Sequence, residues 1–258
     1  MVQKMTTVVT GSASGIGTAI RARLEKAGNK VIGIDVRNAE IIADLSTIEG
    51  RTLAISEVKR RCGDRLDRFV AAAGVGPDTN NPPLICSVNY FGVVDLLDGL
   101  FELLQRGSKS AAVIISSNSA QINPMEDDPY VLAMLEHNEA KAKQIISELG
   151  DCIAAYMGSK NAVARAARRR AMTWGNAGVR LNVVAPGITK TPMHQRVLAD
   201  AKVGDAVRAV PKPLGRDGEP DEIAVVVAFL LGPDASYIHG AVYYVDGGAD
   251  ATIRPERF

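Results

Sequence analysis

The sequence predicts an α/β fold, a doubly wound parallel sheet with helices on both faces. Short β-branched or apolar runs alternate along the chain with longer runs of helical spacing, and a glycine-rich turn joins the first strand to the first helix. Hydrophobic residues make up 47% and charged residues 23% of the chain, as in a globular protein. A chain of 258 residues is long enough for one such domain, so we expect a single domain over residues 1–258.

Each expected strand is a short apolar run flanked by glycine or polar residues. The strands are Thr6–Thr10, Lys30–Asp35, Phe69–Ala73, Ala111–Ser116, Val179–Val184 and Val242–Val245. The expected helices are Ile16–Lys26, Ile48–Arg61, Val88–Leu104, Ala155–Trp174 and Pro220–Leu231. The right-handed crossover of each strand–helix–strand unit places the strands in one parallel sheet.

Two stretches interrupt this alternation. Residues 118–152 contain a helix-like run from Tyr130 to Leu149 and have the character of an insertion before the next sheet-packing helix. Residues 188–218 are rich in proline and glycine and follow a strand end, where substrate loops occur. Met193, Val197 and Leu198 in this loop could line an apolar pocket or form the buried side of a short helix.

The charge balance indicates a small molecule as the partner. Lys plus Arg number 30 and Asp plus Glu 29, so the net charge is +1 and gives no bulk attraction for nucleic acid or an anionic membrane. Arg165 and the run Arg168–Arg170 have no aromatic platform beside them, which favours a solvated or subunit-facing helix surface over a nucleic-acid site.

The cysteines and histidines are scattered. Cys62, Cys86 and Cys152 form no CxxC pair or Cys/His cluster, so we expect reduced thiols and no metal site. The N-terminal Met1–Met5 shows no signal-peptide stretch, and no later run is long enough to span a bilayer, so we expect a cytoplasmic protein.

The turn between the first strand and helix is suited to a dinucleotide. Glycines at 11, 15 and 17 let the backbone approach a pyrophosphate, and the helix N-terminus presents free N–H groups to its charge. Asp35 ends the next strand, where a carboxylate binds the adenosine ribose hydroxyls and repels a 2′-phosphate. These residues favour NAD(H), although Arg37 nearby could accept the phosphate of NADP.

Tyr156 and Lys160 lie four residues apart on one helical face. A tyrosine becomes a useful acid or base when nearby cations lower its pKa, and both Lys160 and an oxidised nicotinamide would do so. Ser117 follows the preceding strand, at the sheet edge where ligands bind. This pattern predicts proton transfer coupled to hydride transfer.

Together, the spacing of Gly11, Gly15 and Gly17 and the Tyr156-x-x-x-Lys160 pair resemble the short-chain dehydrogenase/reductase family, with its Rossmann-type fold. The resemblance implies that Ser117 binds the substrate oxygen and that Ser116 has no such role. It also implies that Asn89 holds a water linking Lys160 to solvent. A helix-interior hydrogen bond to backbone is the alternative for Asn89.

The resemblance also implies the residues of the cofactor site. They are Gly11, Ser14, Gly15, Ile16, Gly17, Asp35, Asp44, Leu45, Ala73, Gly74, Tyr156, Lys160, Pro186, Gly187, Ile188, Thr189 and Thr191. Asp44 and Leu45 correspond to the adenine side, and the backbone of Ile188 with the hydroxyl of Thr189 or Thr191 to the nicotinamide amide. Ala71–Gly74 stands where the family often has Asn-Asn-Ala-Gly, which puts one strand-stabilising contact in doubt.

Within the family, the chain resembles a bacterial branch that acts on 3α-hydroxysteroids, 3-oxosteroids and other bulky carbonyl compounds. The resemblance lies in having an insertion at 118–152 and in Ile34–Glu40, Ser87–Gly92 and Tyr237–Ala241, and it is weakest inside the insertion itself. The insertion there blocks one usual subunit contact, which implies a homodimer formed through residues 220–231 and 242–245. The expected reaction interconverts a secondary alcohol and a ketone with NAD(H). Two alternatives are the same chemistry on a non-steroid aromatic or alicyclic alcohol, and a regulatory protein that only senses dinucleotide.

Overall fold

The computed structural model describes residues 5–123 and 125–257. Residues 1–4 of the N-terminal stretch considered above, residue 124 of the insertion and the last residue of the chain lie outside the described residues.

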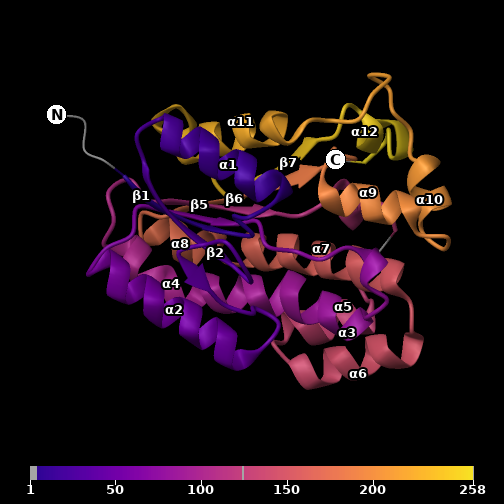
Figure 1. The fold of residues 1–258 in the computed structure, drawn as a ribbon, viewed down its shortest axis with the longest axis horizontal. Helices are drawn as coiled ribbons and strands as arrows, with labels where there is room; N and C mark the ends of the chain where they lie inside the picture. Colours follow the sequence, from indigo (N-terminus) through magenta and orange to yellow (C-terminus); the bar gives the residue numbers. More distant parts are fainter. Residues whose placement is uncertain (1–4, 124, 258) are drawn as a thin grey trace.

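The described residues form a seven-stranded parallel sheet in the order β3-β2-β1-β4-β5-β6-β7 (Figure 1). The strands are β1 (Thr6–Thr10), β2 (Lys30–Asp35), β3 (Ile41–Ile42), β4 (Arg68–Ala71), β5 (Ala111–Ile115), β6 (Arg180–Pro186) and β7 (Val242–Val245). The predicted fold class and the six predicted strands are confirmed. The sequence analysis missed β3, because two residues are too few to show a pattern. Strand order reverses between β1 and β4, which opens a crevice at their carboxyl ends.

Helices cover both faces of the sheet. On one face lie α1 (Gly15–Lys26) and α11 (Pro220–Leu231), and on the other lie α2 (Ile48–Cys62), α4 (Gly92–Gln105) and α7 (Cys152–Arg169) (Figure 1). The remaining helical segments are η1 (Pro77–Thr79), α3 (Pro82–Cys86), η2 (Ser87–Phe91), η3 (Asn118–Gln121), α5 (Pro129–Leu135), α6 (Glu139–Leu149), α8 (Ala171–Asn176), α9 (Pro192–Ala199), α10 (Gly204–Arg208), η4 (Pro233–Ala235) and α12 (Ala249–Ile253).

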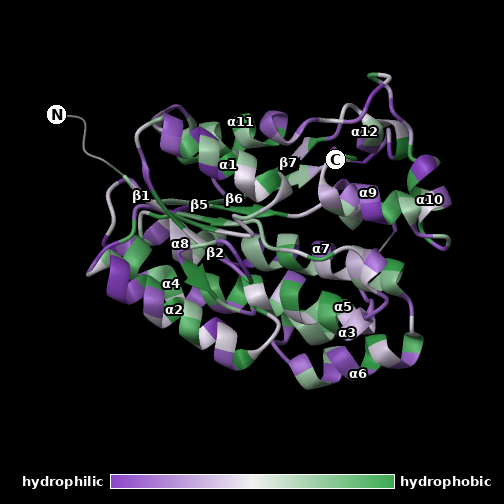
Figure 2. Cartoon of the chain, in the orientation of Figure 1, coloured by the Kyte–Doolittle hydropathy of each residue, from purple (hydrophilic) through white to green (hydrophobic). Residues whose placement is uncertain are grey.

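Alternate residues of each strand supply two separate cores. Val8 and Phe69 point into the core on the α2, α4 and α7 side, whereas their neighbours Val9 and Val70 point into the core under α1 and α11. Strands buried on both faces are hydrophobic throughout, and Figure 2 shows this at the centre of the molecule.

The insertion is helical but does not form one helix. Its predicted run from Tyr130 to Leu149 divides into α5 and α6, because His137 between them has a φ of 58°. Helix α7, which carries Tyr156 and Lys160, starts three residues earlier than predicted, because the Asp151 carboxylate caps it by accepting bonds from the N–H groups of Ile153 and Ala154. It ends at Arg169, and α8 follows as a separate helix.

Residues 82–105 form one continuous helical run, made of α3, η2 and α4. This run is long and apolar enough to cross a bilayer by length and composition, contrary to the sequence analysis, which found none. However, 67% of the apolar 18-residue window within it is buried inside the protein, and the run serves as a core helix.

The 188–218 segment is more regular than its proline and glycine content indicates. It contains α9 and α10, and the Thr191 hydroxyl caps α9 by accepting a bond from the N–H of His194. Both readings of the apolar residues here hold in part: Met193 and Val197 line the cleft described below, and Val197 is also buried under α9.

The core of α4 provides a test of this packing. Leu100→Ala removes a fully buried side chain and should lower the free energy of unfolding by about 2–5 kcal/mol. The same change at Leu149, which is 61% exposed, should alter it by less than about 0.5 kcal/mol. Urea unfolding of both variants at equal protein concentration measures the difference, and equal losses would contradict the assigned core.

Candidate active site

The glycine turn after β1 brings three backbone segments into close contact. Gly11 has a φ of +66°, and a Cβ there would lie 2.8 Å from the Cα of Ala73. A Cβ on Gly17 would lie within 2 Å of the Gly11 carbonyl oxygen. The first turn of α1 therefore packs directly on the loop, and Gly15, Ile16 and Gly17 line the cleft described below.

Asp35 holds this turn from the neighbouring strand. Its Oδ2 accepts a hydrogen bond from the N–H of Ala13 at 3.0 Å, and its Oδ1 accepts one from Val36 at 2.8 Å. The carboxylate lines the cleft together with Arg37. Asp35 thus fixes the phosphate-side loop and presents negative charge where the sequence predicts the adenosine ribose.

Thr10 supplies the contact that the missing asparagines left in doubt. Its hydroxyl oxygen accepts bonds from the N–H groups of Ala72 at 3.1 Å and Ala73 at 3.0 Å. The end of β4 is therefore tied to β1 by a buried threonine. The sequence analysis missed this role, since Thr10 read only as a strand residue.

Lys160 is buried beside Tyr156. Its Nζ donates a hydrogen bond to the carbonyl of Ile115 at 2.9 Å and lies 5.9 Å from the centroid of the Tyr156 ring. Burial lowers the pKa of Lys160 to about 8. Burial also raises the pKa of Tyr156, and hydrogen bonding with Ser117 opposes that rise. The lowered tyrosine pKa expected from the sequence is thus not found in the protein chain itself, where desolvation outweighs the hydrogen bond with Ser117.

Ser116 and Ser117 have different environments at the end of β5. Ser116 donates its hydroxyl to the backbone carbonyl of Lys160 at 2.7 Å and so helps to fix α7 on the sheet. Ser117 lines the cleft, where its oxygen accepts bonds from the N–H and the hydroxyl of Ser119 at 3.2 and 2.9 Å. The hydrogen bond between Ser117 and Tyr156 places both hydroxyl groups at the same point of the cleft wall.

Asn89 lies behind the cleft and is fully buried in η2, a π-helical turn. Its Oδ1 accepts a bond from the Val75 N–H at 2.8 Å, and its Nδ2 donates to the Val75 carbonyl at 3.0 Å. Nδ2 also lies 3.3 Å from the hydroxyl of Ser159, the residue before Lys160. Both backbone bonds go to Val75, in the segment between β4 and η1, and not to the helix interior as the alternative for Asn89 expected. The water-holding role of Asn89 stays a prediction.

The segment after β6 forms the opposite wall. Thr189 donates its hydroxyl to the Gly187 carbonyl at 3.0 Å, and a Cβ on Gly15 would lie 3.2 Å from the Thr191 methyl group. A Cβ on Gly187 would lie 2.6 Å from the Cβ of Asp246, so only glycine lets this strand end turn beside the cleft.

All these walls surround one cleft of about 710 Å³. Every predicted cofactor-binding residue lines it, as does Ser117, whereas Asn89 does not. Apolar residues that the sequence analysis missed also line the cleft. They are Leu84, Val88, Ile122, Ile153, Val203, Ala206, Val207 and Val210. The helical spacing of Val203, Val207 and Val210 was the signal that could have revealed α10.

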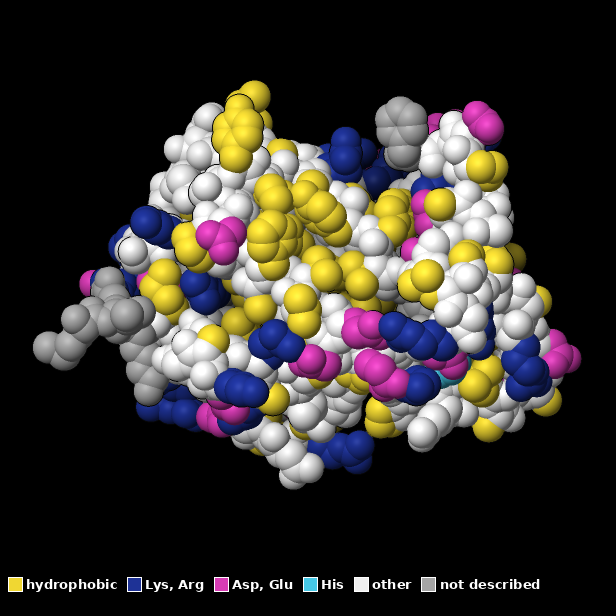
Figure 3. Space-filling model, turned by 90° about the horizontal axis from the view of Figure 1, so that it is seen from above, with side chains coloured by type: hydrophobic (Ala, Val, Ile, Leu, Met, Phe, Trp, Pro, Cys, Tyr) yellow, Lys and Arg dark blue, Asp and Glu magenta, His cyan; other side chains and the backbone are white. Residues whose placement is uncertain are grey.

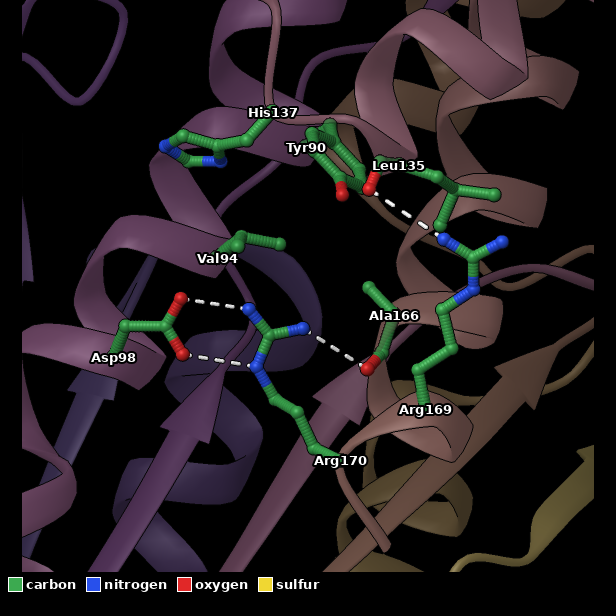
Figure 4. A pocket seen from close by; sticks show the side chains of 8 residues that line it. All are labelled: Tyr90, Val94, Asp98, Leu135, His137, Ala166, Arg169 and Arg170. Carbon is green, nitrogen blue, oxygen red and sulfur yellow. Dashed lines mark hydrogen bonds and ion pairs between the residues drawn. The ribbon is translucent and has the colours of Figure 1, made fainter. Parts of the chain in front are cut away.

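A second hollow, of about 150 Å³, is lined by Arg169 and Arg170 of the basic run at the end of α7 (Figure 4). Arg170 forms a bidentate pair with Asp98 and also donates to the carbonyl of Ala166. Arg169 reaches the carbonyl of Leu135 in the insertion. These arginines therefore make intramolecular contacts, as Figure 4 shows for Arg169 and Arg170. In the described part of the chain, no group of three His, Cys, Asp or Glu residues is placed to hold a metal ion.

Comparison with known proteins agrees with this geometry. A family model described as "Enoyl-(Acyl carrier protein) reductase" matches residues 143–250. The 3-alpha-hydroxysteroid dehydrogenase/carbonyl reductase of Comamonas testosteroni is 47% identical over 97% of this chain and 98% of its own length. A tropinone reductase homologue of Arabidopsis thaliana is 31% identical over 95% of this chain and 93% of its own.

A solved structure is also similar to this chain along nearly its whole length. The crystal structure of the 3-alpha-hydroxysteroid dehydrogenase from Pseudomonas sp. B-0831, complexed with NADH, has a TM-score of 0.97 and 50% sequence identity, covering 98% of this chain and 100% of that one. The resemblance predicted from the sequence is confirmed. The chain belongs to the short-chain dehydrogenase/reductase family of oxidoreductases.

Proposed function

We propose that this protein interconverts a secondary alcohol and a ketone with NAD(H), and that its substrates are 3α-hydroxysteroids and 3-oxosteroids. The observation that carries the proposal is that one cleft is lined by the glycine turn and Asp35, by Ser117, Tyr156 and Lys160, and by several apolar side chains. The relatives from Comamonas testosteroni and Pseudomonas, both named for 3-alpha-hydroxysteroid dehydrogenase activity, support the substrate class.

The residues of the cleft fit a dinucleotide. The N-terminus of α1 and the close-packed glycines suit a pyrophosphate, and Asp35 suits a ribose without a 2′-phosphate. Pro186, Gly187, Ile188, Thr189 and Thr191 would hold the nicotinamide end. The bound nicotinamide supplies or takes up the hydride and, when oxidised, adds a positive charge near Tyr156.

Proton transfer falls to Tyr156. During alcohol oxidation its phenolate oxygen takes the hydroxyl proton as the hydride leaves the carbinol carbon, and during ketone reduction its hydroxyl returns that proton to the carbonyl oxygen. The Lys160 ammonium stabilises the phenolate, and Ser117 donates a hydrogen bond to the substrate oxygen. Asn89 lies outside the cleft and supports this group through its hydrogen bonds with the backbone of Val75 and the hydroxyl of Ser159.

Substituting the tyrosine tests this assignment. Tyr156→Phe should lower turnover at least about 100-fold, since general acid–base catalysis is lost, while NADH affinity stays within a few-fold. The measurement is NADH oxidation with a carbonyl panel that includes a 3-oxosteroid, repeated with NADPH, with NADH titration as the binding control. Turnover with other ketones but not with the 3-oxosteroid would indicate a non-steroid aromatic or alicyclic substrate. Tight NADH binding with no turnover of any carbonyl would favour a dinucleotide sensor.

The pH dependence should have opposite signs in the two directions. Reduction requires a proton on Tyr156 and a charged Lys160, whose pKa is about 8, so its kcat/KM should fall as pH rises through that value. Oxidation requires the deprotonated tyrosine stabilised by the same ammonium, so its rate should rise with pH up to about 8. Initial rates in both directions between about pH 6 and about pH 10 check this. A reduction profile that is flat over that range would contradict the roles given to both residues.

We also propose a homodimer in the cytoplasm. Val225 and Phe229 of α11 are each 44% exposed, and Tyr237 is fully exposed beside the edge strand β7. Figure 3, which views the molecule from the side that α11 covers, shows hydrophobic side chains gathered on that face. Large exposed apolar patches mark association sites, and an unpaired edge strand favours the same contact. The free thiols of Cys62, Cys86 and Cys152 suit a reducing compartment.

Phe229→Asp should shift the protein from dimer to monomer, because it buries a charge in the proposed interface. Sedimentation velocity at several concentrations measures the shift. Leu149→Asp, which charges an exposed leucine on α6, should leave the state unchanged. A wild-type protein that sediments as a monomer at all concentrations would contradict the proposal.

A further inference from the structure

A charged residue is buried where the insertion meets the body of the protein. Arg51 of α2 is only 2% exposed, yet it forms ion pairs with Asp95 of α4 at 2.8 Å and with Glu139 of α6 at 2.6 Å. Burying a guanidinium is costly unless its charge and donors are matched. Two carboxylates from different helices provide that match, with His137 and Lys143 at their outer side.

Glu139 also connects the insertion to the turn in front of α4. While Oε2 pairs with Arg51, Oε1 accepts a hydrogen bond from the Ser87 hydroxyl at 2.9 Å. Ser87 is 2% exposed, so water does not compete for this bond. A single carboxylate at the start of α6 thus holds α2 and Ser87 together.

Ser87 is the first residue of the π-helical turn that carries Asn89. A π-turn is a rare backbone form, found mostly at functional sites, and it needs support from its surroundings. Two residues beyond Ser87, Asn89 bonds the Val75 backbone and approaches Ser159, which precedes Lys160. A contact that fixes Ser87 therefore also helps to fix Asn89 and its bonds with Val75 and Ser159, beside the catalytic lysine.

We propose that Arg51, Glu139 and Ser87 form a brace through which the insertion holds Asn89 in its working position. Glu139 and Ser87 are positioning residues, since neither lines the cleft. The expected effect of the brace on turnover rests on the proposed function. The brace would also give the 118–152 insertion a part in catalysis. Without the brace the π-turn can relax toward an ordinary helix, which rotates Asn89 away from Val75.

The central test is Ser87→Ala, which deletes one hydroxyl and leaves the Arg51 ion pairs intact. We expect kcat to fall about tenfold, part of the ~100-fold that a small misplacement can cost, with KM for NADH unchanged. Hydrogen exchange at the Val75 amide, which bonds to Asn89, should become faster. The control is Ser56→Ala, which removes the same group from an exposed site on α2.

The conservative pair at Glu139 adds a rescue. Glu139→Gln keeps an oxygen that can accept from Ser87 and should retain more activity than Glu139→Ala. Combining Ser87→Ala with Glu139→Ala should cost no more kcat than Glu139→Ala alone, because both act through one contact.

Three results would overturn the brace. They are a Ser87→Ala enzyme with wild-type kcat, unchanged exchange at Val75, and an activity loss that only matches a loss of folded, NADH-binding protein. Faster exchange at Val75 in a protein whose wild type turns over no carbonyl compound would support the brace and refute the proposed function. Normal wild-type turnover with no response to Ser87→Ala would do the reverse.

Discussion

The close approach of the backbone between β1, β4 and α1 is the constraint on which the rest of the cleft depends. A methyl group at Gly11 or Gly17 would collide with main-chain atoms, so the two strands and the helix can meet only if both positions lack a side chain. Asp35 then binds the turn through the N–H of Ala13, and Thr10, the residue before Gly11, binds the end of β4. The loop is thus rigid before any ligand arrives, which lowers the entropic cost of holding a pyrophosphate.

Much of the fold could be predicted because its signals are local. Strands such as Thr6–Thr10 and helices such as Pro220–Leu231 are set by short runs of apolar residues and by their end residues, and these lie where they were expected. The errors arise where one residue overrides a longer pattern. His137 adopts a positive φ and divides the insertion helix, and Asp151 starts the catalytic helix early.

The site was predictable to a different degree. The glycine turn, Asp35 and the Tyr156–Lys160 pair follow strand ends in an expected order, so topology brings them to one edge of the sheet. By contrast, Thr10, the α10 side chains and the bond between Ser87 and Glu139 depend on contacts between distant segments. The raised pKa of Tyr156 could not be read from the sequence, because it follows from the depth of burial and not from the neighbouring charge.

The junction between α6 and α7 has a consequence for how such enzymes diversify. Only Gly150 and Asp151 separate the two helices, and Tyr156 lies little more than one turn into the second. Ile153, the second residue of α7, also lines the cleft. A lineage cannot trim or exchange this segment as it would an ordinary surface loop, because the same few residues set the entry of the catalytic helix. Changes in substrate range are therefore easier to acquire on α9 and α10, which adjoin the cleft without fixing the position of Tyr156.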